Sequence, residues 1–201
     1  MGSTRFRGRS TRIGWIPLVA LGVLAGVAPW PSAAGASVGC TPGAVEQPYL
    51  AWRDARHYAL APGGSFEDGA AGWSLTGGAQ LEAPGAWFVP ASSQVSLYLP
   101  PGSAATSAPI CVGRRDAVAR MFARSGGGAL SAMLRVQVLR TRSGAAAAHA
   151  VGDVSAAPAW RVTRRLATCV GAASWIRYRL APAGNAAVSI DDLYVDPWAK
   201  W

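Results

Sequence analysis

Two stretches of sequence, far apart in the chain, decide the fold: PGGSFEDGAAGW at residues 62–73 and VSIDDLYVD at residues 188–196. The first is a glycine-rich lead into a strand, and it carries one carboxylate, Glu67, beside an apolar phenylalanine. The second has the composition of a closing strand that is interrupted by two carboxylates, Asp191 and Asp192. Both stretches therefore predict strands, and both bring acidic side chains into them.

Between these stretches, short runs of alternating apolar and polar residues are separated by turns rich in Gly, Pro and Ser, which is typical of an all-β protein. Where the alternation is clear, one face of a strand is apolar and the other is polar, as in antiparallel sheets packed as a sandwich. The Ala-rich segment 143–149 is expected to be a loop or a short helix. We predict an all-β, antiparallel β-sandwich, with strands at residues 74–75, 79–81, 87–89, 95–99, 108–112, 117–124, 131–141, 150–154, 160–166, 174–180 and 187–195.

The beginning of the chain has the pattern of a secretory signal peptide. Four arginines precede an apolar run at residues 13–27, and the small residues Ala34, Gly35 and Ala36 follow it. A membrane-spanning helix needs roughly 20 apolar residues, and this run is shorter. We therefore expect a cleaved signal peptide at residues 1–36, an N-terminal arm at 37–59 with one helical turn, a β-sandwich domain at 60–201, and a secreted, extracellular product without a membrane span.

The charge balance restricts the class of partner. The chain of 201 residues has 19 basic and 10 acidic side chains, which gives a net charge of +9. Loss of residues 1–36 removes four of the basic residues, so the remaining charge is positive but moderate. A negatively charged partner is allowed by this charge and not required by it. Export and the moderate charge together argue against a nucleic acid.

The sequence lacks the usual catalytic motifs. It has no H-E-x-x-H, no C-x-x-C and no phosphate-binding G-K motif. Its two histidines, His57 and His149, have no neighbouring Ser or Cys in the context of a nucleophile. The acids are scattered and form no evident pair of the kind that a glycosidase needs. We expect a protein that is not an enzyme, with a hydrolase as the less favoured alternative.

Three cysteines, Cys40, Cys111 and Cys169, permit one disulfide in an exported chain. We predict that Cys40 pairs with Cys111 and so attaches the arm to the sandwich. In the alternative, residues 37–40 act as a lipoprotein signal, Cys40 is lipidated, and Cys111 pairs with Cys169.

Several predicted strands carry arginine and aromatic residues on their polar faces. Sugar rings bind to flat aromatic faces, and arginine recognises carboxylate or sulfate groups through two parallel hydrogen bonds. If these strands share one concave sheet, they form a groove for a polysaccharide, and the arginines favour an acidic one. In the alternative, the arginines only protect a wet sheet face against aggregation, and the arm or a loop covers Trp175. The candidate ligand-binding residues are Tyr98, Arg120, Phe122, Arg124, Arg135, Gln137, Trp175, Arg177 and Arg179.

Together, the two end segments and the strand rhythm between them resemble the galactose-binding-like jelly roll, and in particular small carbohydrate-binding modules. The chain is also similar to small exported bacterial proteins that carry this domain alone, with the segment ICVG at residues 110–113. The resemblance implies that the first and last strands lie side by side and that the domain binds rather than catalyses. It further implies that Glu67, Asp191 and Asp192 hold a structural Ca²⁺ with backbone carbonyls, because hard oxygen ligands suit this ion. In the alternative, these acids face solvent, pair with arginine or cap turns.

The leading hypothesis is therefore a secreted, monomeric, non-catalytic binder of a glycan or of a cell-envelope polysaccharide. A second hypothesis, from a different class, is a structural or protein-interaction domain of the cell surface whose arginine-rich face meets an anionic partner.

Overall fold

The computed structural model describes residues 41–86, 93–113, 117–142, 145–168 and 174–198. They belong to one compact unit, Ser37–Trp201. Within the described residues, the regular structure consists of strands and a single 3₁₀ helix, η1 (Leu50–Trp52). None of the described segments is a helix with the length and apolar character needed to cross a membrane. The predicted signal peptide lies outside the described residues, so it stays a prediction.

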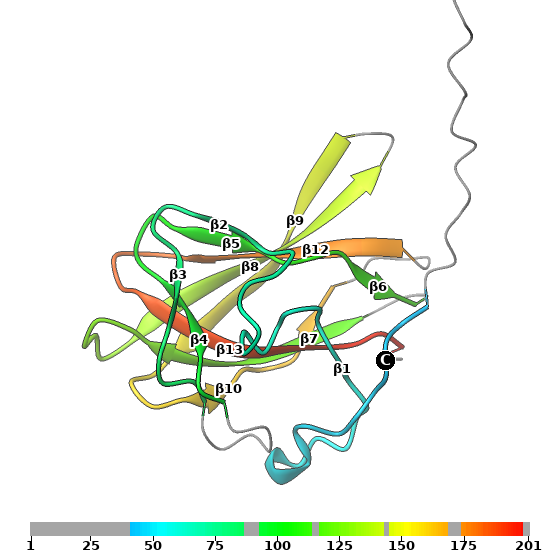
Figure 1. Ribbon diagram of the computed structural model, residues 1–201, viewed down its shortest axis with the longest axis horizontal. Helices are drawn as coiled ribbons and strands as arrows, with labels where there is room; N and C mark the ends of the chain where they lie inside the picture. Colours follow the sequence, from blue (N-terminus) through cyan, green and yellow to red (C-terminus); the bar gives the residue numbers. More distant parts are fainter. Residues whose placement is uncertain (1–40, 87–92, 114–116, 143–144, 169–173, 199–201) are drawn as a thin grey trace, which may run out of the picture. The chain divides into compact units, whose positions relative to one another are not determined.

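Two antiparallel sheets pack face to face (Figure 1). The seven-stranded sheet has the order β10 (Arg161–Val162), β7 (Val118–Ser125), β13 (Val188–Asp196), β4 (Ser96–Leu99) and β3 (Gln80–Glu82), with β1 (Ala59–Leu60) beside β13 and β11 (Leu166–Ala167) beside β7. The six-stranded sheet has the order β2 (Ser74–Thr76), β5 (Ala104–Thr106), β12 (Ser174–Pro182), β8 (Ala132–Arg142) and β9 (Ala145–Ala156), with β6 (Ile110–Val112) beside β12. The predicted all-β sandwich is confirmed.

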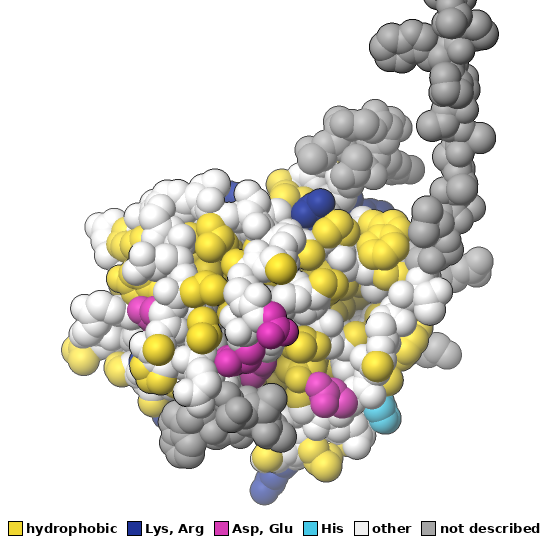
Figure 2. All heavy atoms as spheres, in the orientation of Figure 1, with side chains coloured by type: hydrophobic (Ala, Val, Ile, Leu, Met, Phe, Trp, Pro, Cys, Tyr) yellow, Lys and Arg dark blue, Asp and Glu magenta, His cyan; other side chains and the backbone are white. Residues whose placement is uncertain are grey.

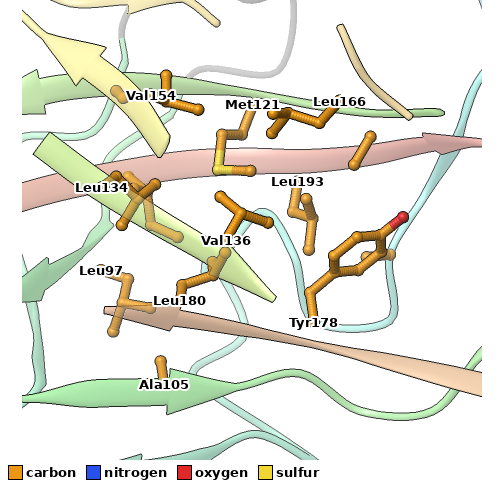
Figure 3. Close-up of a cluster of buried hydrophobic side chains, with 14 of the residues drawn as sticks. Leu97, Ala105, Met121, Leu134, Val136, Val154, Leu166, Tyr178, Leu180 and Leu193 are labelled. Carbon is orange, nitrogen blue, oxygen red and sulfur yellow. The ribbon is translucent and has the colours of Figure 1, made fainter. Parts of the chain in front are cut away.

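The core lies between the two sheets, and the alternation within the strands builds it. On β8, Leu134, Val136 and Val138 are fully buried, while the residues between them face outward. Figure 3 shows Leu134 and Val136 between the layers, near Met121 and Leu180, which belong to the same core cluster. Full burial of a side chain of this size stabilises the folded state by roughly 1.5–3 kcal/mol, so the inward positions of each strand fix its register.

The first and last strands are neighbours, as the resemblance implies. Strand β1 pairs with β13 through Ala59 opposite Val195 and Leu60 opposite Tyr194. The expected strand at 62–73 is wrong, because this segment forms consecutive turns directly after β1. Its glycines explain the turns. A side chain at Gly64 would lie 2.9 Å from the backbone oxygen of Leu193, so only glycine fits there.

Other boundaries also differ from the predictions. The Ala-rich segment 143–149 was expected to be a loop or a short helix, but residues from 145 onward belong to β9. Strand β9 pairs with β8 along its whole length, and this cross-strand pairing outweighs the weak preference of alanine for strands. The expected strand at 160–166 is divided into β10 and β11. The expected strand at 87–89 lies outside the described residues.

The N-terminal arm packs on the outer face of the seven-stranded sheet (Figure 1). Its Tyr49 and Tyr58 are fully buried there, in one apolar cluster with Phe122 of β7 and Tyr194 of β13. The rings of Tyr49 and Tyr58 meet edge to face with their centroids 5.1 Å apart, an arrangement that aromatic pairs favour. The arm thus covers part of this sheet, which decides where a ligand can reach the protein.

Candidate functional site

The nine predicted ligand-binding residues do not lie on one face. Trp175, Arg177 and Arg179 are on β12, and Arg135 and Gln137 are on the neighbouring β8. The other four, Tyr98 on β4 and Arg120, Phe122 and Arg124 on β7, belong to the opposite sheet. The expectation of one groove is therefore wrong, because strands with the same alternation were assigned to one sheet when they form two. The candidate site is the outer face of the six-stranded sheet.

We call the outward residues of β12, β8 and the neighbouring β9 the open face. Its aromatic residue, Trp175, is 47% exposed and lies opposite Cys111 of β6. Trp175, Arg177 and Arg179 alternate along β12, so they point to the same side of the sheet. Arg179 lies directly opposite Gln137 of β8 and donates from Nη1 to its Oε1 at 3.1 Å. The open face thus carries one indole and a row of planar, hydrogen-bonding side chains.

The arginines of the open face differ in their partners. Arg135 forms two parallel hydrogen bonds with Asp153 of β9, each 3.0 Å long. The hydrogen bond from Arg135 lowers the pKa of Asp153 below its usual value. Arg177 donates from Nη1 to the backbone oxygen of Ser107 at 3.0 Å. Among the described residues, neither Arg177 nor Arg179 has a carboxylate within 4.0 Å, so both keep donors for an external anion.

Two of the predicted residues are sealed beneath the arm. Arg120 is 9% exposed, and its Nη1 lies 2.6 Å from Oδ2 of Asp54 in the arm. Its Nε donates to the backbone oxygen of Thr163 at 3.0 Å, and its guanidinium lies 4.8 Å from the ring centre of Tyr49. Phe122 is fully buried. Neither side chain is accessible to a ligand in this structure, because the arm occupies the space above them.

Asp54, whose carboxylate is the ionic partner of Arg120, was not identified from the sequence pattern alone. Burial by itself would raise its pKa, but hydrogen bonds from Tyr58 and Arg120 outweigh burial, and the pKa of Asp54 is lowered. The signal that could have found it is the aromatic composition of the arm, which predicts packing and therefore a partner for any charge within it.

The remaining two predicted residues, Tyr98 and Arg124, lie beyond the arm on the seven-stranded sheet. Arg124 donates from Nη2 to Oε1 of Glu82 at 3.1 Å, and its guanidinium lies 5.0 Å from the ring centre of Trp160. Tyr98, Arg124 and Glu82 line one pocket. Glu82 was also missed, because nothing in the short strand that carries it indicates an ionic partner on β7.

The acidic residues of the two end segments come close together, and Figure 2 shows acidic side chains gathered on one side of the domain. Glu67 accepts hydrogen bonds through Oε1 from the backbone N–H groups of Gln94 (2.9 Å) and Val95 (3.0 Å). Asp191 accepts through Oδ2 from the backbone N–H of Ala86 at 2.7 Å and from the hydroxyl of Ser93. Both carboxylates therefore anchor the ends of the segment between β3 and β4.

Asp192 is the exception in this group. Its Oδ2 is buried and has no hydrogen-bond partner. Burial, followed by repulsion from Asp191 and Glu67, raises its pKa to about 8. Asp192 also has a positive φ of 48°, at the register shift where β13 bulges against β7. A carboxylate in this position needs a proton or a cation to neutralise it.

The three acids do not form a complete metal site by themselves. Within the part of the chain that the structure describes, no group of three or more His, Cys, Asp or Glu side chains is arranged to hold a metal ion. Glu67 and Asp191 already use oxygen atoms for protein hydrogen bonds. The residues fit a Ca²⁺ ion only in part: Asp192 and Glu67 each keep one carboxylate oxygen that these hydrogen bonds do not use, and the remaining ligands would have to be backbone carbonyls or water.

Cys111 is disulfide-bonded, and the other two cysteines, Cys40 and Cys169, lie outside the described residues. The predicted pairing of Cys40 with Cys111 therefore stays a prediction, as does the alternative with Cys169.

No protein-family model and no curated protein matches the sequence. Solved structures do have a similar fold. The CBM22-1 xylan-binding domain of Paenibacillus barcinonensis Xyn10C is 17% identical, with a TM-score of 0.51 over 68% of this chain and 93% of that chain. The C-terminal family 22 carbohydrate-binding module of Clostridium thermocellum Xyn10B is 16% identical, with a TM-score of 0.50 over 72% of this chain and 96% of that chain. At these identities the likeness concerns the fold alone: this chain has the jelly-roll β-sandwich of small carbohydrate-binding modules.

Proposed function

We propose that this protein binds a polysaccharide along the open face and releases it unchanged. The observation that carries the proposal is the outward-facing row of Trp175, Arg177 and Arg179 on β12 beside Gln137 on β8, in which Trp175 and Arg177 are exposed and Arg179 is half-buried. At about 3.3 Å per residue, the Cα atoms of Trp175 and Arg179 are about 13 Å apart. This length suits several units of an extended chain better than a single sugar ring. Trp175 supplies the flat apolar surface, and the planar polar groups supply orientation.

The arginines favour an anionic polysaccharide within this class. Arg177 and Arg179 have no carboxylate partner among the described residues, and each guanidinium has five donors in a fixed geometry. A uronic acid carboxylate or a sulfate group can accept two parallel hydrogen bonds from such a side chain. Of the two structural neighbours described above, one is named a xylan-binding domain and the other a carbohydrate-binding module, which supports a polysaccharide as the class of ligand.

We propose binding without catalysis, because the open face has too few acids for hydrolysis. Glycosidases of the common type place two carboxyl groups on either side of the bond they cleave. Of the described residues on the open face, only Asp153 carries a carboxylate, and Arg135 binds both of its oxygens. The signal-peptide pattern at residues 1–36 and the disulfide of Cys111 support a site of action outside the cell, with lipid anchoring through Cys40 as the alternative to free secretion.

We also propose that Asp192 binds a structural Ca²⁺ together with backbone carbonyl oxygens. The support is its buried, unpartnered Oδ2 beside two further carboxylates. The ion would neutralise the negative charge of Asp192 beside Asp191 and Glu67 and would take no part in contact with the glycan.

The test of the main proposal is a binding screen of the purified protein against soluble polysaccharides: xylan, galactan, polygalacturonate and a sulfated glycan. We expect the acidic polymers to bind best, and Trp175→Ala to weaken binding at least tenfold, about 1.4 kcal/mol. Trp52→Ala is the control, because it removes another partly exposed indole from the arm side of the molecule. Unchanged binding by Trp175→Ala would reject the open face. Binding to an acidic protein surface, with no polysaccharide bound, would favour the interaction-domain hypothesis instead.

A further inference from the structure

The pocket lined by Tyr98, Arg124 and Glu82 lies on the outer face of the seven-stranded sheet, beyond the part that the arm covers. Its volume is about 310 Å³, and it is bounded by Glu82 of β3, Tyr98 of β4, Arg124 of β7 and the glycine turn 126–128. Pockets for small molecules begin at roughly this volume, so the space suits one ring and not a polymer. The open face plays no part in it, because the two surfaces belong to different sheets.

The strand register creates this pocket. Ser189 of β13 lies opposite both Tyr98 of β4 and Arg124 of β7, so these three side chains form one outward row across three strands. Glu82 reaches this row: its Oε1 accepts from Arg124 at 3.1 Å and from the hydroxyl of Ser189 at 2.6 Å. A side chain at Gly126 would lie 2.8 Å from Cε2 of Tyr98, so glycine at this position makes room for the ring.

The polar groups of the pocket keep unused hydrogen-bonding capacity. Both hydrogen bonds to Glu82 go to Oε1, which leaves Oε2 to accept. Arg124 uses Nη2 for Glu82, and its Nη1 makes no hydrogen bond with the described residues, so the guanidinium keeps donors. The hydroxyl of Tyr98 makes no hydrogen bond with the described residues, and it can both donate and accept. The pocket therefore has three available polar groups: a donor on Arg124, an acceptor on Glu82, and the hydroxyl of Tyr98, which can be either.

This combination selects a ligand by its chemistry. The charges of Arg124 and Glu82 balance each other at 3.1 Å, so the pocket has no excess charge to attract an ion. A donor beside an acceptor matches two neighbouring hydroxyl groups, each of which can donate one hydrogen bond and accept another. Pro158 and Leu130, which is 87% exposed, add apolar surface at the rim. An uncharged sugar ring has this mixture of adjacent hydroxyls and apolar C–H faces.

We propose that this pocket is a second binding site, which takes one uncharged pyranose ring through two adjacent hydroxyl groups held by Glu82, Arg124 and Tyr98. The ring belongs to a free monosaccharide or to a chain end or branch of a glycan. This site is independent of the polysaccharide site on the open face, and either can exist without the other.

The test uses the intact protein and methyl pyranosides as probes: glucoside, galactoside, mannoside, xyloside and, as the charged comparison, glucuronide. Saturation-transfer NMR detects binding, and titration gives the affinity. We expect at least one uncharged probe to bind with a Kd in the millimolar range and the glucuronide to bind no better than the glucoside. Oligosaccharides that present the same ring at a chain end should bind with similar affinity if the ring alone is recognised.

Two variants test the assignment. Tyr98→Phe keeps the ring in place and removes the hydroxyl, so we expect about fivefold weaker binding with unchanged thermal stability. Glu82→Gln should weaken binding at least tenfold. Trp175→Ala, on the other sheet, should leave the affinity for the pyranoside unchanged. Weaker binding of polysaccharide by this variant would test only the open face and not the second site. Three outcomes would each overturn the second site. None of the probes binds, the glucuronide binds better than the uncharged probes, or Tyr98→Phe and Glu82→Gln bind the pyranoside as tightly as the wild type does.

Discussion

The outer surfaces of the two sheets contrast sharply in what covers them. On the seven-stranded sheet, Arg120 points outward from its strand, but the arm seals it: the side chain is 9% exposed, with Asp54 at 2.6 Å. On the six-stranded sheet, Arg177 also points outward, and it stays exposed with one hydrogen bond to a backbone oxygen. The same residue type at the same kind of position therefore holds a segment in place on one face and is free for a ligand on the other.

The largest effect expected from this contrast is on stability. Arg120→Ala would leave Asp54 buried without its charged partner, and breaking a buried ion pair in this way costs about 3–5 kcal/mol. Arg177→Ala removes an exposed side chain and should change the free energy of unfolding by less than about 0.5 kcal/mol. Urea unfolding of both variants measures the difference. Equal midpoints for the two variants would show that the arm does not depend on the Arg120–Asp54 pair.

This contrast also shows how far the sequence could be read. The alternation on β7 correctly placed Arg120, Phe122 and Arg124 on the side away from the core, because a strand repeats every two residues. It could not show that Tyr49 and Tyr58 cover the first two of them, since this depends on contacts more than 60 residues apart in the chain. Assigning β7 and β8 to one sheet failed for the same reason: sheet membership is decided by long-range pairing.

The two end segments, 62–73 and 188–196, also combine local features that the sequence could predict with long-range contacts that it could not. The resemblance to the galactose-binding-like jelly roll implied that the first and last strands meet, and the motifs that carry this resemblance are local features of the sequence. The partners of the acids of β13 were not predictable. Asp191 binds Ala86, which is 105 residues away in the chain, and only the folded structure shows that Asp192 keeps an unpartnered oxygen.

The second prediction concerns Asp192 and pH. In the folded state its pKa is raised to about 8 from an ordinary value of 3.8, so the folded protein keeps a proton that the unfolded chain has lost. Stability from this group is therefore complete below about pH 4 and declines as the pH rises toward 8. In the presence of a calcium chelator, we expect Asp192→Asn to melt at least about 2 °C above the wild type at pH 8, which corresponds to about 1 kcal/mol, and close to it at pH 4.

Added Ca²⁺ should reverse this order at pH 8, because the ion favours the charged carboxylate of the wild type and the amide of Asp192→Asn binds it poorly. Differential scanning calorimetry with and without calcium gives the result. If calcium does not change the melting temperature of the wild type, a structural calcium ion is excluded. If the melting temperature of Asp192→Asn depends on pH in the same way as that of the wild type, the carboxylate of Asp192 is not the group that titrates.

The smallest expected effect concerns the charge preference of the open face. Arg135 is 53% exposed and Asp153 is 36% exposed, and an ion pair this accessible to water adds little to stability. Asp153→Asn should therefore leave the urea midpoint unchanged. It should also free the guanidinium of Arg135 and remove a negative charge from the face, so an anionic polysaccharide should bind a few times more tightly while a neutral one binds as before. Comparing both polymers against wild type and variant separates charge from shape. If the variant gained affinity for both polymers equally, the arginines would act through packing, and the preference for an anionic glycan would have to be given up while the open face itself remained the site.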